Sequence, residues 1–275
     1  MALERSHETA ATVTGFTDQG KARPNNEDAL CVDAELGLII VADGMGGHEA
    51  GEVASGMAVS IIPRYFREMS QTVHTGGVTE NHFSAATNKL GSCLQVANQK
   101  IFEAAHRSPE DSGMGTTCTA VLIEDDRLGI AHVGDSRCYL IRRGEMELLT
   151  NDHSLVMEQL RSGLISKDDQ VVQSAQNILT RSLGISEEVN IELEEHPLFA
   201  GDVLLLCSDG LGKELGDDEV LQVVNETPDP AALAKRLIEL ANAAGGRDNI
   251  TVAVARLDKA GLGQSIKGFF KSITG

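Results

Sequence analysis

Short β-like runs dominate the sequence, and tight turns join several of them. Strand-like runs occupy residues 12–18, 29–33, 36–42, 116–123, 128–134 and 137–143. The Asp125-Asp126 and Arg143-Gly144 steps each fall between two such runs, with the short spacing of a β-hairpin. A hairpin joins neighbouring strands in opposite directions. The pattern therefore favours antiparallel sheets over the βαβ crossovers of a parallel sheet.

Two long helical segments interrupt the strands, near residues 52–69 and 82–105. In the second segment apolar residues recur at spacings of three and four, including Leu90, Leu94 and Ile101, which predicts one apolar face packed on a sheet. Pro63 lies inside the first segment and predicts a kink or an early end there. Further helices are expected at residues 217–225 and 230–244, before a last strand that ends near residue 257.

The length of 275 residues suits one large domain. We place it at residues 8–257, with an inserted polar flap at about 154–176 that is followed by strand-like residues 177–182. The remaining residues, 258–275, form a glycine-rich tail that we interpret as frayed, with a docking segment as the alternative.

The composition excludes several classes of partner. The formal net charge of −18 removes the electrostatic attraction on which non-specific binding to nucleic acid or anionic lipid depends. The apolar runs are far shorter than the roughly 20 residues of a membrane span. The five cysteines are odd in number and include no C-x-x-C pair, which argues against a disulfide framework or a structural zinc site. We expect a cytoplasmic monomer that binds no nucleic acid and does not span a membrane.

Aspartates recur where an apolar strand meets a turn. They are Asp43, Asp135, Asp209 and Asp248. Each one alone is most simply a turn residue. Together they predict that several carboxylates gather at one edge of packed sheets.

Clustered carboxylates raise one another's pKa, and a divalent cation would relieve that repulsion. Carboxylate oxygens without a Cys or His cluster favour Mg²⁺ or Mn²⁺. Gly44 has no side chain, so its carbonyl can approach an ion closely. Arg23 precedes Glu27 and Asp28 and offers a guanidinium fork for a phosphoryl group, although such an arginine alone is more often a surface residue.

Five short motifs occur in a characteristic order. They are Arg23-x-x-x-Glu27-Asp28, Val41-Ala-Asp43-Gly44-Met-Gly-Gly, Gly134-Asp135-Ser136-Arg137, Ser208-Asp209-Gly210 and Arg247-Asp248-Asn249. The ordered set, within residues 12–257, resembles the bacterial form of the metal-dependent type 2C serine/threonine protein phosphatases. The resemblance implies an α/β (α+β) fold, a four-layer αββα sandwich of two mainly antiparallel sheets flanked by helices.

The resemblance also implies a centre that holds two Mn²⁺ or Mg²⁺ ions. Asp43 would bridge the two ions, the Gly44 carbonyl would bind one of them, and Asp209 and Asp248 would bind the other. Glu27 and Asp28 would complete the centre directly or through water. Asp135 matches the position that, with Asp209, holds a third ion in some relatives.

The implied activity is hydrolysis of phosphoserine and phosphothreonine in proteins by in-line attack of water, with a cognate serine/threonine kinase as counterpart. Arg23, Asp43 and Asp209 are the candidate catalytic residues. Some relatives carry a histidine directly after the Asp-Gly step as general acid, whereas this chain has Met45. His48 and His153 are nearby alternatives, and each is more simply structural.

Two other functions fit the same residues less well. A catalytically silent module that binds phosphoproteins would not need the full set of acidic residues and Arg23. A hydrolase of another phosphoester, such as a nucleic acid, is disfavoured by the net charge of −18.

Overall fold

A computed structural model describes residues 9–46, 50–72, 82–107, 109–165 and 178–259. In this part of the chain, eleven strands form two sheets in which every pairing is antiparallel. The first sheet has the order β1 (Thr9–Asp18), β11 (Ile250–Lys259), β10 (Val203–Cys207), β7 (Arg137–Arg142), β8 (Glu145–Leu148). The second has the order β2 (Asp28–Asp33), β3 (Leu38–Met45), β5 (Cys118–Glu124), β6 (Arg127–Val133), β9 (Glu192–Pro197), and the short β4 (Gly115–Thr116) pairs with β3.

Both predicted hairpins are confirmed. Asp125 joins β5 to β6 with φ 56°, and Arg143 joins β7 to β8 with φ 54°. These left-handed conformations are what short hairpin turns require.

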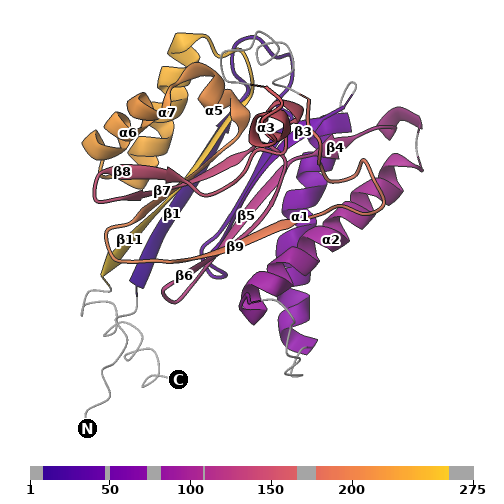
Figure 1. The fold of residues 1–275 in the computed structure, drawn as a ribbon, viewed down its shortest axis with the longest axis horizontal. Coiled ribbons are helices and arrows are strands. Elements are labelled where there is room, and N and C mark those ends of the chain that lie inside the picture. The colour runs from indigo at the N-terminus through magenta and orange to yellow at the C-terminus, as the bar shows by residue number, and fades with distance from the viewer. Residues whose placement is uncertain (1–8, 47–49, 73–81, 108, 166–177, 260–275) are drawn as a thin grey trace, which may run out of the picture.

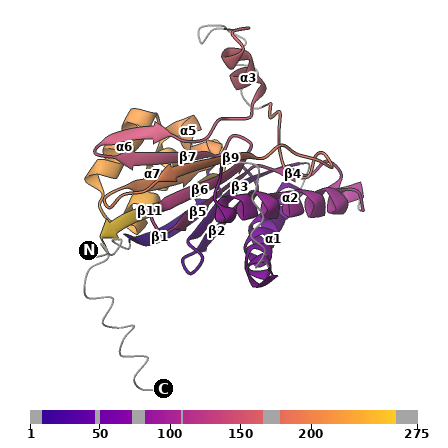
Figure 2. The same cartoon turned by 60° about the horizontal axis from the view of Figure 1, so that its bottom comes forward.

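Helices cover the outer face of each sheet, as the view in Figure 1 shows. The α1 (Ala50–Thr72) and α2 (Ala85–Ala105) helices pack on the second sheet, and α5 (Asp209–Glu214), α6 (Asp217–Glu226) and α7 (Pro230–Ala244) pack on the first. The predicted four-layer αββα sandwich is confirmed. A short α3 (Leu155–Arg161) projects from these layers in Figure 2.

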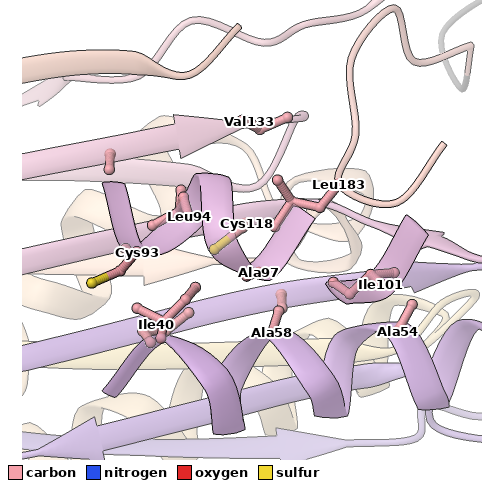
Figure 3. Close-up of a cluster of buried hydrophobic side chains, with 14 of the residues drawn as sticks. Ile40, Ala54, Ala58, Cys93, Leu94, Ala97, Ile101, Cys118, Val133 and Leu183 are labelled. Carbon is pink, nitrogen blue, oxygen red and sulfur yellow. The ribbon is translucent and has the colours of Figure 1, made fainter. Parts of the chain in front are cut away.

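The core has three apolar layers. One lies between the two sheets, and one lies between each sheet and the helices that cover it. Ile39 and Val41 from β3 meet Leu204 and Leu206 from β10 in the central layer. On the outer face of β3, Ile40 packs in one cluster with residues of α1 and α2, and the small side chains of Ala54 and Ala58 on α1 point toward α2 (Figure 3). Small residues at this contact let the helices approach each other closely, which fixes the start of α1 beside the end of β3.

Several sequence predictions need correction. Pro63 neither ends α1 nor shortens it, because Ile62 and Phe66 beside it are buried in the core and hold the helix in place. Residues 178–182 form no strand but only an isolated bridge, Leu179 to Ser154. The second helix starts at Ala85, where Ser84 accepts a hydrogen bond from the Thr87 amide. Helix α5 was not expected.

Parts of the domain prediction lie outside the described residues. These are residues 166–177 of the flap and residues 260–275 of the tail, and the last strand continues to Lys259. All five cysteines are free thiols. In the part of the chain that the structure describes, no helix has the length and apolarity needed to cross a bilayer.

Candidate metal centre

The predicted acidic residues meet at one end of the sandwich because the strands that carry them end or begin there. Asp28 opens β2 and lies opposite Asp43 in the β2–β3 ladder. Asp209 follows β10, and Asp248 precedes β11, which is the neighbour of β10. Asp135 lies in the turn between β6 and β7, which links the two sheets.

A groove of about 750 Å³ opens at this end of the molecule. Its lining includes Arg23, Asp135, Asp209, Asp248, Lys213 and Arg247 on one part and Val156, Met157 and Leu160 of α3 on another. Asp28 is buried, and Asp43 and Glu27 are partly buried. The predicted site residues thus form one group that lines the groove and a second group, Glu27, Asp28 and Asp43, that does not line it.

Asp28 joins the two sheets through a single oxygen. Its Oδ2 accepts hydrogen bonds from Ser208 Oγ and Thr251 Oγ1, both at 2.7 Å. Its Oδ1 is buried and has no partner. Burial raises the pKa of Asp28 to about 7, an effect that the two hydroxyl donors oppose and that the charges of Asp209 and Asp248 increase.

The pKa values of Asp43 and Asp135 are raised in the same way. Burial raises the pKa of Asp43 well above its usual value, and the carboxylates of Asp28, Asp209 and Asp135 add to this. Burial, together with Asp209, raises the pKa of Asp135 to about 7. Carboxylates gathered in this way favour either protonation or a bound cation.

Two cations already contact the outer carboxylates. The Arg23 guanidinium grips Asp248 as a fork, with Nε 2.7 Å from Oδ1 and Nη2 2.9 Å from Oδ2. Lys213 Nζ lies 2.7 Å from Asp248 Oδ2 and also contacts Asp209 Oδ2. Burial alone would raise the pKa of Asp248, but Lys213 and Arg23 hold that pKa below its ordinary value.

The donor set fits a hard divalent cation. Asp28 Oδ1 and Asp209 Oδ1 are buried oxygens without a partner, and an unpaired buried carboxylate oxygen is costly. Among the described residues, no three acidic, histidine or cysteine side chains are placed to hold one ion together as they stand. Asp209 and Asp248 instead contact the ammonium group of Lys213 and the guanidinium group of Arg23.

Gly44 occupies a position where no other residue fits. Its amide donates to the Glu27 carbonyl at 3.0 Å. A Cβ at this position would lie 2.1 Å from the Gly51 carbonyl oxygen and 2.6 Å from the Glu27 carbonyl oxygen. The glycine therefore lets β3, the first turn of α1 and the Glu27 loop meet beside the acidic residues.

Asn249 has a role that the sequence analysis did not assign. Its Oδ1 accepts from the Glu27 amide at 2.9 Å, and its Nδ2 donates to the carbonyls of Gln19 and Asn25, both at 2.8 Å. One side chain thus fixes the loop that carries Arg23 and Glu27. The motif containing Asn249 was the only signal in the sequence for this role.

Lys213, Ser208 and Thr251 were also missed. Lys213 is four residues after Asp209, the spacing of neighbours on one helix face, and α5 was not predicted. Ser208 and Thr251 bind Asp28 across 180 and 223 residues of sequence, so no local pattern could reveal them.

The two histidines considered as general acids, His48 and His153, differ in what the structure shows of them. His48 lies outside the described residues. His153 is buried: its Nδ1 accepts from the Gly134 amide at 3.1 Å, and its Nε2 lies 2.9 Å from Glu192 Oε2. His153 therefore supports the loop that carries Asp135, and among the described residues that line the groove there is no histidine. Met45 ends β3 and pairs with Gly115 of β4.

A partly buried ion pair connects the same loop to the base of α3. Arg137 binds Asp152 through Nε at 3.1 Å and through Nη2 at 2.7 Å. Arg137 follows Asp135 by two residues, and Asp152 precedes Ser154, which caps α3 by accepting from the Met157 amide. The flap helix is thereby anchored beside the acidic residues.

Known proteins resemble the chain over most of its length. The family model described as Protein phosphatase 2C matches residues 20–255. A serine/threonine phosphatase, stp, of Listeria monocytogenes is 38% identical over 245 residues, which is 88% of this chain and 94% of the relative.

Solved structures agree with the sequence comparisons. The crystal structure of the Mycobacterium tuberculosis serine/threonine phosphatase PstP/Ppp has a TM-score of 0.78 and 36% identity, and covers 90% of this chain and 99% of that one. The catalytic domain of PstP in complex with two manganese ions has a TM-score of 0.77 and 35% identity, and covers 91% of this chain and 99% of that one. The Staphylococcus aureus phosphatase Stp1 has a TM-score of 0.77 and 30% identity, and covers 93% of this chain and 98% of that one. These relatives are serine/threonine phosphatases, and the chain belongs to the same enzyme family, protein phosphatase 2C.

Proposed function

We propose that this phosphatase hydrolyses phosphoserine and phosphothreonine in proteins with the help of two divalent ions, Mn²⁺ or Mg²⁺. The observation that carries the proposal is a cluster of carboxylates from both sheets. Two oxygens of this cluster, Asp28 Oδ1 and Asp209 Oδ1, are buried and have no hydrogen-bond partner. The ions would supply a nucleophilic water at neutral pH and would offset the repulsion between the acidic residues and a phosphate dianion.

Each residue has a defined part in this proposal. Asp43, at the centre of the carboxylates, would be shared by both ions, with the Gly44 carbonyl beside it. Asp209 and Asp248 would hold one ion from the groove side, while Glu27 and Asp28 would complete the centre. Asp135, at the mouth of the groove, would serve a third ion together with Asp209.

Arg23 would position the phosphoryl group. Its side chain is 49% exposed at the edge of the groove and already binds a carboxylate as a two-pronged fork. A phosphoryl group offers the same geometry to a guanidinium. Since no described residue lining the groove is a histidine, the proton for the departing serine or threonine oxygen would arrive through water.

The partners follow from this chemistry. Phosphorylated proteins would enter the groove between the cationic residues and the apolar face of α3, and a serine/threonine kinase would produce them. A flap that flanks a rigid catalytic groove would then contribute to substrate choice.

The test measures hydrolysis of p-nitrophenyl phosphate and of phosphoserine and phosphothreonine peptides, with Mn²⁺ or Mg²⁺ and with a chelator. We expect turnover that the chelator abolishes and Mn²⁺ restores. Folded protein that binds phosphopeptides without chelator-sensitive turnover would be a silent binding module instead. Cleavage of nucleic acid without phosphopeptide turnover would indicate a different phosphoesterase.

A further inference from the structure

Lys213 occupies a position between two of the proposed metal ligands. It lies on α5, one helical turn after Asp209, and its ammonium group contacts Oδ2 of Asp209 and, at 2.7 Å, Oδ2 of Asp248. The side chain is 30% exposed and lines the groove. The residue is therefore within reach of water, as are its two carboxylate partners, which line the same groove.

The surrounding charges explain why the ammonium group stays there. The carboxyl groups of Asp28, Asp43 and Asp135 lie close enough to Asp209 to interact with it electrostatically. The positive groups that directly contact the proposed ligands are Lys213 and Arg23, and Arg23 contacts only Asp248 among them in the described hydrogen bonds and ion pairs. Burial alone would favour loss of the Lys213 proton, but the two carboxylates outweigh it and hold the pKa of Lys213 above its usual value.

An ammonium group and a divalent ion repel each other when they bind the same carboxylate. Both are cations, and a metal ion needs ligand oxygens at about 2.0–2.6 Å. A metal bound to these Oδ2 oxygens would displace Lys213, and a metal bound to the other oxygen of either carboxylate would still lie close to its positive charge.

We propose that Lys213 is a built-in counter-ion that competes with the divalent metal for Asp209 and Asp248. It stabilises the metal-free protein by neutralising part of the carboxylate cluster, and for the same reason it lowers the affinity for the metal. Its flexible stem lets the displaced ammonium group move into the groove beside Arg23 and Arg247. This inference rests on the metal centre of the proposed function.

The first test compares Lys213→Met with Lys100→Met, a control on α2 whose lysine pairs only locally with Glu103 in the described ion pairs. Methionine keeps most of the apolar stem and removes the charge. Calorimetric titration with Mn²⁺ should show at least about tenfold tighter binding for Lys213→Met and no change for Lys100→Met. The increase in melting temperature between chelator and Mn²⁺ should also be larger for Lys213→Met, because the metal-free state loses its counter-ion.

A second test needs no variant. Lysines of the wild-type protein are acetylated briefly in chelator and in Mn²⁺, and the extent at Lys213 is measured by mass spectrometry relative to Lys100. We expect the relative labelling of Lys213 to rise severalfold in Mn²⁺, since the metal frees its ammonium group.

The outcomes separate this inference from the proposed function. Equal Mn²⁺ affinity of Lys213→Met and wild type, or labelling of Lys213 that Mn²⁺ leaves unchanged, would overturn the competition. Wild-type protein that binds no Mn²⁺ at all would overturn both the competition and the proposed metal centre.

Discussion

Asp28 and Asp43 lie opposite each other on neighbouring antiparallel strands, and burial raises the pKa of both. The β2–β3 ladder thus presents paired carboxylates at the edge of one sheet, while Asp209 and Asp248 come from the ends of adjacent strands in the other. The sandwich brings these edges together. Such a cluster of carboxylates is stable when some of its groups are protonated or when cations accompany it.

Asp43→Asn should lower turnover by at least about a hundredfold in saturating Mn²⁺, because the central carboxylate of the proposed centre loses its charge. The amide keeps the size of the side chain, so circular dichroism should remain that of the wild type. Asp33→Asn is the control, since Asp33 ends β2, the strand paired with β3, at the end away from Asp43, and pairs with Arg67. Near-normal turnover of Asp43→Asn would remove the central role of this residue.

Arg23→Ala should raise the KM for phosphopeptides by about tenfold while changing Mn²⁺ affinity much less, because the guanidinium would contact the phosphoryl group in the substrate complex. Arg23 also grips Asp248, so the two measurements must be made together. Steady-state kinetics give KM, and calorimetry gives the Mn²⁺ affinity. An unchanged KM with altered Mn²⁺ binding would mean that Arg23 serves Asp248 alone.

Short strand-like runs, hairpin turns and one apolar helix face are local patterns, and they identified most strands and the main helices correctly. The four-layer sandwich and the roles of the site residues were what the family resemblance implied, and the contacts between these residues were not predicted. Helix α5 is six residues long, too short to show a period. Lys213 contacts carboxylates that follow one strand and precede another. The partners of Asn249 lie more than 200 residues away in the sequence, and no local pattern can reveal them.

Asn249→Ala should lower the free energy of unfolding by about 2 kcal/mol, because three backbone groups of the Arg23 loop lose their partner. Phosphopeptide KM should rise as well, since the loop carries Arg23. Denaturant unfolding measures the first effect and steady-state kinetics the second. Asn225→Ala, at an exposed position on α6, is the control and should change stability by less than about 0.5 kcal/mol. A loss of stability in Asn225→Ala equal to that in Asn249→Ala would contradict the special role of Asn249.

Gly44→Ala and Gly56→Ala should change stability in opposite directions. A Cβ at Gly44 would collide with the carbonyl oxygens of Gly51 and Glu27, whereas a Cβ at Gly56, inside α1, would meet nothing within 4 Å. We expect Gly44→Ala to cost about 3 kcal/mol and Gly56→Ala to gain up to about 1 kcal/mol through its better helix propensity. Chemical denaturation of both variants checks this, and a well-tolerated alanine at position 44 would show that the β3–α1 junction can open.

His132→Gln should flatten the acid sensitivity of the protein. Burial, helped by the neighbouring His153, lowers the pKa of His132 to about 4 from 6.5. Between these values the unfolded chain binds a proton that the native protein does not, so stability is present above pH 6.5 and is lost as the pH falls toward 4. The contribution amounts to about 3 kcal/mol.

The measurement is the free energy of unfolding from denaturant titrations at several pH values between 4 and 7. Glutamine keeps a donor and an acceptor near Asn151 and Thr119, the partners of the ring at 3.1 and 2.9 Å, but it does not titrate in this range. His106→Gln, on the exposed end of α2, should retain the wild-type slope. If His132→Gln loses stability toward acid as steeply as the wild type does, the acid sensitivity originates elsewhere, and the buried ring beside the Asp135 loop does not set it.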